Sequence, residues 1–204
     1  AGRSEFARAI YGELEPDSGV ILFDGQEVNL RKPQDAITHG VLYVAEDRRH
    51  QGLFPIRATR DNLSAGILHS LTSLFGLIRP QREELVALAI MKQLSIKASS
   101  PMAPVSSLSG GNQQKVVLGR GLTHKPRVLM LDEPTGGLDP LMQQEVLGLI
   151  QEARAGGATV FFSSHIMSEV QAIADRVAMI RAGEIINVAE TSALIHSALR
   201  HVTI

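Results

Sequence analysis

Cysteine is absent from the 204 residues, so the chain has neither a disulfide framework nor thiol chemistry. Long apolar runs are missing too, and the nearest candidate, Leu63–Ile78, contains His69 and several serines and glycines. That run is too short and too polar for a membrane span, so we expect an amphipathic or buried helical segment. Lys and Arg number 20 and Asp and Glu 21, for a formal net charge of -1. This balance gives no electrostatic argument for nucleic-acid binding.

The most informative stretch is residues 127–140, RVLMLDEPTGGLDP. Val128–Leu131 is a short apolar run bounded by turn signals, which predicts a buried strand. Asp132 and Glu133 follow, and Pro134 cannot continue a central strand. Two carboxylates at the end of a hydrophobic strand are costly to desolvate unless a cation or proton compensates them. An isolated Asp-Glu pair more often caps the next element; the functional alternative is a magnesium ion facing Asp132 and a water polarised by Glu133.

Three further motifs accompany this strand: LSGGNQ at 108–113, GLD at 137–139 and SSH at 163–165. With the Asp-Glu-Pro-Thr strand end, they match in order, type and spacing the signature, Walker B, D-loop and switch-histidine motifs of one family. The chain resembles the ATP-binding-cassette (ABC) ATPases. Four motifs in the right order make a chance match very improbable.

The first residues, Gly2, Arg3 and Ser4, precede an expected helix that runs to about Tyr11. They look like the tail of a phosphate-binding loop, G-x-x-x-x-G-K-[ST], with Arg3 in the Lys position and Ser4 in the magnesium-ligand position. The strand and first glycine of such a loop are not in the sequence, so we expect an N-terminally truncated piece of a longer polypeptide. Arg is a planar fork rather than a compact ammonium. This departure is typical of the second cassette of tandem sugar-importer ATPases and puts full-rate hydrolysis in question.

Glu46 ends the next expected strand, Val41–Ala45, at a position where the family generally has Gln. The run EDRRHQGL at 46–53 resembles the second cassette of ribose- and xylose-type importers, whose Q-loop residue touches magnesium. The alternative is a solvated charged turn. Residues 135–140 and 162–165 look more like exporter cassettes, so the two halves of the chain point to different subfamilies.

The expected fold class is α/β, with a P-loop NTPase-like, mostly parallel sheet, a small antiparallel β piece with strands at 20–23 and 28–30, and an α-helical subdomain. We expect one ABC ATPase domain over 1–204, with its nucleotide-binding core at 1–46 and 108–204 and helices and loops over about 47–107. Apolar residues recur at helical spacing over Arg82–Leu94, and for most of them we expect core packing. A terminal hairpin and a last helix over 192–199 complete the expected order. The apolar positions in the 82–94 segment are Leu85, Leu88, Ala89, Met91 and Leu94.

The resemblance implies an ATPase that uses Mg2+ and ATP to energise solute transport, most closely sugar import. It would be cytoplasmic and peripheral on the inner face of the cell membrane. Its partners would be a second ATP-binding cassette and transmembrane permease subunits, with no nucleic acid. The alternatives are a non-catalytic regulatory cassette that donates its signature loop and, less favoured, a soluble ABC protein acting on DNA or ribosomes. The latter would need a long coiled-coil or basic insertion, which is not visible.

The resemblance also assigns roles to individual residues. Glu133 would be the general base, and His165 would contact the γ-phosphate and orient the attacking water. The magnesium ligands would be Ser4, Glu46 and Asp132. The nucleotide contacts, in part to ATP held by a partner cassette, would be Gly2, Arg3, Ser4, Glu46, Ser109, Gly110, Gly111, Gln113 and Asp139.

Overall fold

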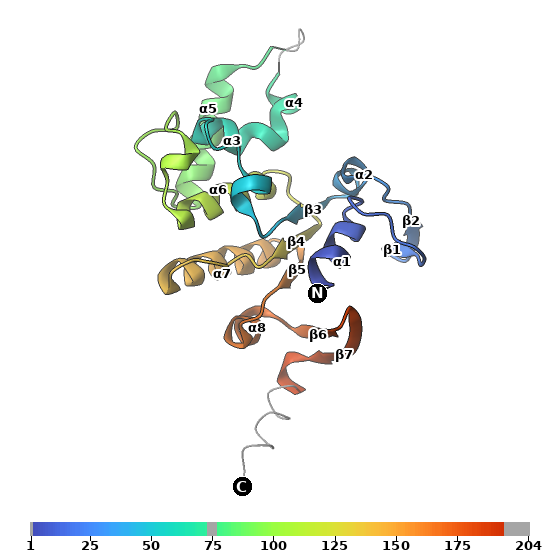
Figure 1. Ribbon diagram of the computed structural model, residues 1–204. Helices are drawn as coiled ribbons and strands as arrows, with labels where there is room; N and C mark the ends of the chain where they lie inside the picture. The colour runs from blue at the N-terminus through green and yellow to red at the C-terminus, as the bar shows by residue number, and fades with distance from the viewer. Residues whose placement is uncertain (1, 73–76, 194–204) are drawn as a thin grey trace.

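The computed structural model describes residues 2–72 and 77–193. Its centre is a three-stranded parallel sheet of β3 (Val41–Val44), β4 (Val128–Asp132) and β5 (Thr159–Ser163), in the order β3-β4-β5 (Figure 1). The strands pair in register, with Val44 opposite Leu131 and Leu131 opposite Phe162. Their carboxyl ends therefore meet at one edge of the sheet. The predicted α/β class with a mostly parallel sheet is confirmed.

Both faces of β3 and β4 are buried, as a parallel sheet requires. Leu129 and Leu131 join one core cluster with residues of α6 (Gly110–Leu122) and α7 (Pro140–Ala155). Met130, which points the other way, joins a second cluster beside α1 (Arg3–Ile10) and α2 (Pro33–Thr38). Each of these three β4 side chains is at most 2% exposed. The middle strand is thus held by apolar packing on both sides.

A small antiparallel pair, β1 (Ile21–Phe23) and β2 (Gln26–Val28), lies beside α2. Asp24 and Gly25 turn between them with positive φ, 52° and 76°. The second strand, predicted over 28–30, begins earlier because this two-residue turn pairs Phe23 directly with Gln26. The far end of the chain forms another antiparallel hairpin, β6 (Arg176–Arg181) with β7 (Glu184–Glu190), after α8 (Met167–Ile173).

A group of short helices occupies the end of the molecule opposite the β6–β7 hairpin (Figure 1). The expected helical segment 63–78 is divided among short elements, and Thr72 then pairs with Ile78 in an isolated antiparallel bridge. Within the described residues, no helix is long and apolar enough to cross a membrane. The elements between β3 and α6 are η1, a π-helical turn (Arg48–Gly52), α3 (Thr59–Ser64), η2 (Ala65–Ile67), α4 (Leu68–Leu71), α5 (Pro80–Gln93) and η3 (Val105–Ser107).

Helix α5 packs through a different face from the one its apolar residues suggested. Met91 is buried, but Leu85 and Leu88 are 68% and 44% exposed, so core packing was wrong for these two. The buried face instead includes Glu83, 5% exposed, and Ala87, spaced four residues apart. Glu83 is tolerated there because the Ser64 hydroxyl donates a 2.5 Å hydrogen bond to it and Arg60 lies 3.4 Å away.

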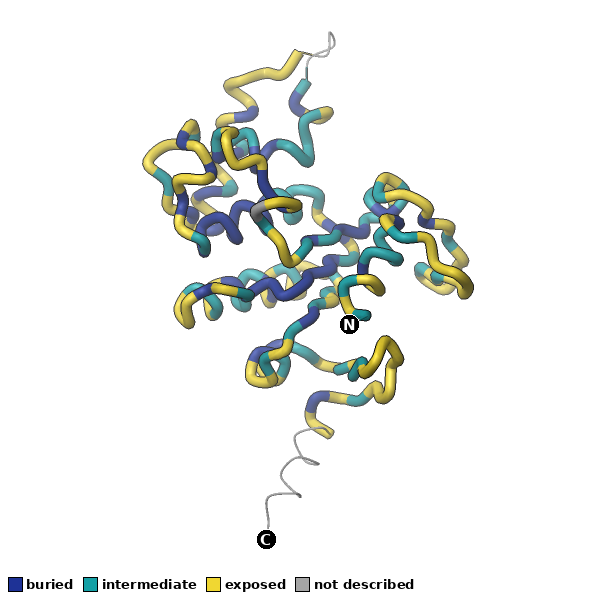
Figure 2. Tube along the Cα trace, in the orientation of Figure 1, coloured by how far each residue is buried: buried dark blue, intermediate teal, exposed yellow. Residues whose placement is uncertain are grey.

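On the side away from β4, strand β5 faces a cavity of about 650 Å³ rather than another strand of the described chain. The β6–β7 hairpin lies across this cavity, and Figure 2 shows it largely exposed, unlike the helices around α6. Beyond the hairpin, positions 194–199 of the helix expected over 192–199 lie outside the described residues.

Candidate functional site

The start of α1 is shaped by Gly2, which caps the helix in a left-handed conformation with φ 102°. A Cβ atom there would lie 3.0 Å from the Gly183 Cα, a distance at which backbone would have to move. The Gly2 N–H donates a 3.0 Å hydrogen bond to the Glu5 carboxylate. Glycine therefore satisfies both the φ and the close approach. Ser4, half-buried, lies in the first turn of the same helix.

Arg3 and His165 bind the two carboxylate oxygens of Glu133 from opposite ends of the sequence. The Arg3 Nη1 donates to Oε1 at 2.7 Å, and the His165 Nδ1 lies 2.8 Å from Oε2. Glu133 follows β4 in a left-handed conformation with φ 45°, which non-glycine residues rarely adopt. Its side chain is 8% exposed, against 42% for Arg3 and 69% for His165. A buried carboxylate is thus placed beneath two groups that solvent can reach.

Asp132, next to Glu133, has both oxygens engaged by hydroxyl groups. The Ser163 Oγ donates to Oδ1 at 2.6 Å, and the Tyr43 hydroxyl donates to Oδ2 at 3.2 Å. Ser163 Oγ also accepts a 3.0 Å hydrogen bond from the Glu133 N–H. Burial foremost, and then the Asp132 carboxylate, raises the pKa of Tyr43 well above its usual range. One serine therefore fixes both the first carboxylate and the strained backbone of the second.

The motifs gave no role to Tyr43 or to Ser163, although Ser163 is the first residue of the SSH motif. Ser163 meets Asp132 because the two lie opposite one another across the β4–β5 pairing. Tyr43 of β3 lies opposite Met130 of β4, and its hydroxyl reaches Asp132, two residues after Met130. The signal that could have found them is strand register, which the sequence leaves open until the pairing of the strands is known.

The oxygen groups expected around a magnesium ion fit the chemistry of that ion but do not form a cage. Carboxylate and hydroxyl oxygens are hard donors, and Mg²⁺ keeps several waters and phosphate oxygens when a protein holds it. Glu46 is exposed just past the end of β3, at the same sheet edge as Glu133. Across 2–72 and 77–193, no hydrogen bond or ion pair joins its side chain to Ser4 or Asp132. Within these ranges no three His, Asp or Glu residues cluster as a metal site.

The signature segment forms the N-terminus of α6. Ser109 caps the helix, and its Oγ accepts hydrogen bonds from the Asn112 side chain at 2.9 Å and backbone at 3.4 Å. Gly110 and Gly111 form the first turn, where free backbone N–H groups favour an anion. Gln113 instead faces the interior. It is 7% exposed, and its Nε2 donates to the carbonyls of residues 105 and 108.

Two side chains, Arg48 and Met142, link the signature to the residues on either side of the D-loop. Arg48 donates from Nη1 to the Gly136 carbonyl at 3.0 Å, and its Nη2 lies 3.1 Å from the place where a Gly110 Cβ would stand. Asp139 caps α7 by accepting a 3.0 Å hydrogen bond from the Met142 N–H. The Met142 side chain packs on Gly111 so closely that a Cβ there would collide with it. The sequence missed Arg48 as a connector because the Gly136 carbonyl that it contacts lies 88 positions further along the chain.

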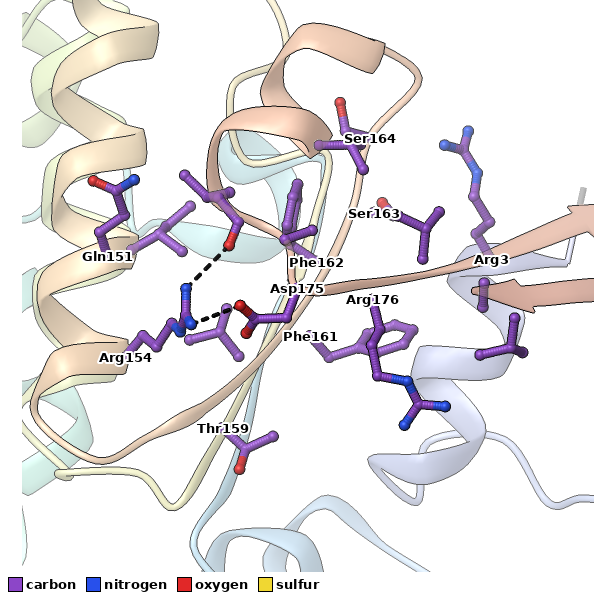
Figure 3. A pocket seen from close by; sticks show the side chains of 18 of the residues that line it. Arg3, Gln151, Arg154, Thr159, Phe161, Phe162, Ser163, Ser164, Asp175 and Arg176 are labelled. Atoms are coloured by element: carbon purple, nitrogen blue, oxygen red, sulfur yellow. Dashed lines mark hydrogen bonds and ion pairs between the residues drawn. The ribbon is translucent and has the colours of Figure 1, made fainter. Parts of the chain in front are cut away.

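The cavity beside β5 extends from Arg3 and Ser163 to the Arg154–Asp175 ion pair, whose atoms are 2.7 Å apart (Figure 3). Between these ends its lining is mostly apolar, with side chains such as Phe162. Arg3, the partner of Glu133, lines one end of the cavity, and the Arg154–Asp175 ion pair lines the other. Only the stretch between these charged ends suits apolar groups.

Residues 1–136 match the model of the ABC transporter family. The chain belongs to this family. The ribose import ATP-binding protein RbsA of Geobacillus kaustophilus is 40% identical over 194 residues, which are 95% of this chain and 39% of that protein. The arabinose import ATP-binding protein AraG of Yersinia pestis is 37% identical over 91% of this chain and 35% of its own length. The chain thus spans less than two-fifths of the length of these curated relatives.

Solved structures of ABC cassettes share the fold. A nucleotide-free ATP-binding cassette from an ABC transporter superposes with a TM-score of 0.80 at 20% identity, over 98% of this chain and 80% of that one. A dimeric cassette in a post-hydrolysis state, bound to ADP and Pi, gives a TM-score of 0.76 at 19% identity, over 93% and 81% of the two chains. The predicted family is confirmed, and so is the resemblance to sugar-import cassettes. The exporter-like character of the C-terminal half stays a prediction.

Proposed function

We propose that the chain is a cassette that binds and hydrolyses Mg-ATP to energise transport of a solute across a membrane, most closely sugar import. The observation that carries this proposal is the convergence of Arg3, Glu133 and His165 at the carboxyl end of the parallel sheet. A cation, a buried carboxylate and an imidazole meet where open α/β sheets bind their ligands. The names of the sugar-import relatives support the choice of transport as the process.

In this proposal Glu133 is the general base and accepts the proton of the water that attacks the terminal phosphate. His165 holds the carboxylate from the side of Oε2, and its exposed ring would also contact the phosphate. The Gly2 turn, Arg3 and Ser4 receive phosphates at the start of α1. Asp132, Ser4 and Glu46 would hold a magnesium ion, which would supply positive charge to neutralise and orient the phosphates. Tyr43 and Ser163 keep the Asp132 carboxylate in one orientation.

The signature segment serves a second nucleotide. Its anion-binding helix start, Ser109–Gly111, is joined to the Glu133 cluster by no hydrogen bond or ion pair of the described residues. Two separate phosphate sites on one chain call for a second cassette, so that each signature faces the other chain's nucleotide. Asp139, on the D-loop at the start of α7, would also meet that partner. Gln113 supports the signature from within, by holding the chain before the helix.

Transmembrane permease subunits are the proposed membrane partners, and they would place the cassette in the cytoplasm at the inner face of the cell membrane. The helical end of the molecule offers them an apolar surface: Phe54, Ile56 and Met102 are 53%, 89% and 56% exposed. Beside them lies a smaller cavity of about 310 Å³ lined by Leu53, Pro55 and Val105, among others. Exposed apolar patches of this kind mark protein interfaces.

Steady-state ATP hydrolysis by the assembled transporter tests the role of Glu133. Glu133→Gln should lower the rate by about 100-fold or more, since general-base catalysis is worth about 10²–10⁴-fold. Glu152→Gln is a matched control, because Glu152 is an exposed residue in the last turn of α7. An unchanged rate with Glu133→Gln would refute the assignment.

The second candidate is a regulatory cassette that only donates its signature loop. The ion pair between Arg3 and Glu133 favours it, because the carboxylate and the phosphate ligand neutralise each other. In that case Glu133→Gln would leave the rate of the assembly unchanged, whereas Ser109→Arg, which blocks the signature helix start, would abolish it.

A further inference from the structure

The Arg3–Glu133 ion pair joins two groups with very different exposure. The carboxylate is 8% exposed and the Arg3 side chain 42%, and the contact distance is 2.7 Å. A buried carboxylate needs a cation or strong donors, because its desolvation is otherwise costly. Arg3 carries a permanent charge, whereas His165 on the other oxygen is charged only when protonated. Arg3 is therefore the dependable counter-charge of Glu133.

Both oxygens of Glu133 are occupied in this arrangement, one by Arg3 and one by His165. A carboxylate in a charge-assisted hydrogen bond is a poorer proton acceptor than a free one. The same guanidinium is the group that the proposed function assigns to phosphate. Nucleotide phosphates and the Glu133 carboxylate would therefore compete for the Arg3 guanidinium, which is exposed enough for a phosphate to reach it.

We propose that Arg3 is a positioning residue that holds Glu133 engaged until the phosphates of a nucleoside diphosphate or triphosphate draw the guanidinium away. Phosphate binding then releases the base, which the Arg3 guanidinium otherwise keeps engaged. The inference rests on the proposed function, and it predicts an energetic coupling between residue 3 and residue 133. Coupling between two such groups is a free energy that a double-mutant cycle measures directly.

The experiment is calorimetric binding of Mg-ADP to the chain and to Glu133→Gln, Arg3→Gln and the double variant. ADP has no γ-phosphate to hydrolyse, so slow turnover cannot imitate tight binding. Glu133→Gln should bind ADP about 5- to 10-fold more tightly, a coupling within the usual 5- to 150-fold range. In the Arg3→Gln background the same change at Glu133 should alter affinity less than about twofold, since no cation remains to be released.

An equal gain in both backgrounds would show simple repulsion between Glu133 and phosphate and would overturn the inference. No gain in either background would overturn it too, while binding by the wild type would leave the proposed function standing. Absence of ADP binding by all four proteins would overturn the proposed function itself. Arg3→Lys is a second variant that keeps a charge at position 3 if Arg3→Gln fails to fold. Its single ammonium should give a coupling smaller than that of Arg3, and an equal coupling would contradict the assignment to the guanidinium.

Discussion

The two sides of the sheet differ in how completely they are packed. On the β3–β4 side, Leu129 and Leu131 are buried under α6 and α7. On the β5 side, Phe161 is 39% exposed, and the β6–β7 hairpin beyond the cavity has Ile185 and Ile186 at 52% and 57%. Figure 2 shows the same contrast along the chain. The first side supplies stability, and the second leaves space next to the candidate site.

The candidate site lies on the border between these sides. Glu133 directly follows β4, which is buried on both faces. His165 follows β5, which is more exposed. Arg3 reaches Glu133 from the start of α1 and also lines the cavity. A rigid carboxylate facing more accessible partners is what a ligand-responsive site needs, since only the partners have to move.

The largest expected effect is on the packed side. Leu129→Ala should lower the free energy of unfolding by about 3 kcal/mol, because the removed side chain is 1% exposed and leaves a cavity between β4 and the helices. Ile185→Ala, in the exposed hairpin, is the matched control and should change it by less than about 0.5 kcal/mol. Urea denaturation of both variants measures the difference. Equal losses would show that the hairpin side is packed as tightly as the helix side.

An intermediate effect is expected in α5, where a polar residue is buried and a leucine is exposed. Glu83→Ala should cost about 2 kcal/mol, because it removes the 2.5 Å acceptor of the buried Ser64 hydroxyl and one of the two carboxylates beside Arg60. Leu85→Ala should cost less than about 0.5 kcal/mol, since Leu85 is 68% exposed. Thermal and urea unfolding of the pair checks the ranking. A larger loss of stability from Leu85→Ala than from Glu83→Ala would support the core packing of Leu85 that the sequence predicted.

The smallest effect concerns pH. Burial foremost, and then the neighbouring His69 and Arg120, lowers the pKa of the half-buried His124. Folding therefore favours neutral His124, so its contribution is present above the unfolded pKa of about 6.5 and is lost as pH falls. Between pH 7.5 and 5, the free energy of unfolding of the wild type should fall further than that of His124→Gln. The difference between the two losses should be well under about 1 kcal/mol. Denaturation curves at both pH values test it, and identical pH dependences would contradict the assignment.

Much of the fold could be read from local patterns. The apolar runs 128–131 and 41–45 predicted two strands of the parallel sheet, and the small antiparallel pair was expected near 20–30. The buried face of α5 could not be read in this way. Glu83 is buried only because Ser64, nineteen residues earlier, supplies a donor, and no local pattern encodes that contact.

The candidate site shows the same limit. The family resemblance assigned Glu133 and His165 to one site, and they do meet, yet the contact of Arg3 with Glu133 spans 130 positions and was not expected. The resemblance assigned Arg3 to phosphate, because a motif position carries a role without geometry. Tyr43 and Ser163 depend on strand register and were missed for the same reason. Conversely, Gln113 fitted a motif but is buried against backbone carbonyls.

The most direct test of the central claim is to locate a bound nucleotide by paramagnetic broadening of backbone amide signals with Mn-ADP. The account predicts that the amides of Ser4, Glu133 and Ser164 lose intensity first, because the metal and phosphates would bind at this end of the sheet. The amides of Ile56 and Leu85, in the segment between β3 and α6 at the end of the molecule opposite the β6–β7 hairpin (Figure 1), should keep theirs. Broadening centred on either of those residues, with Ser4 and Glu133 unaffected, would contradict the account.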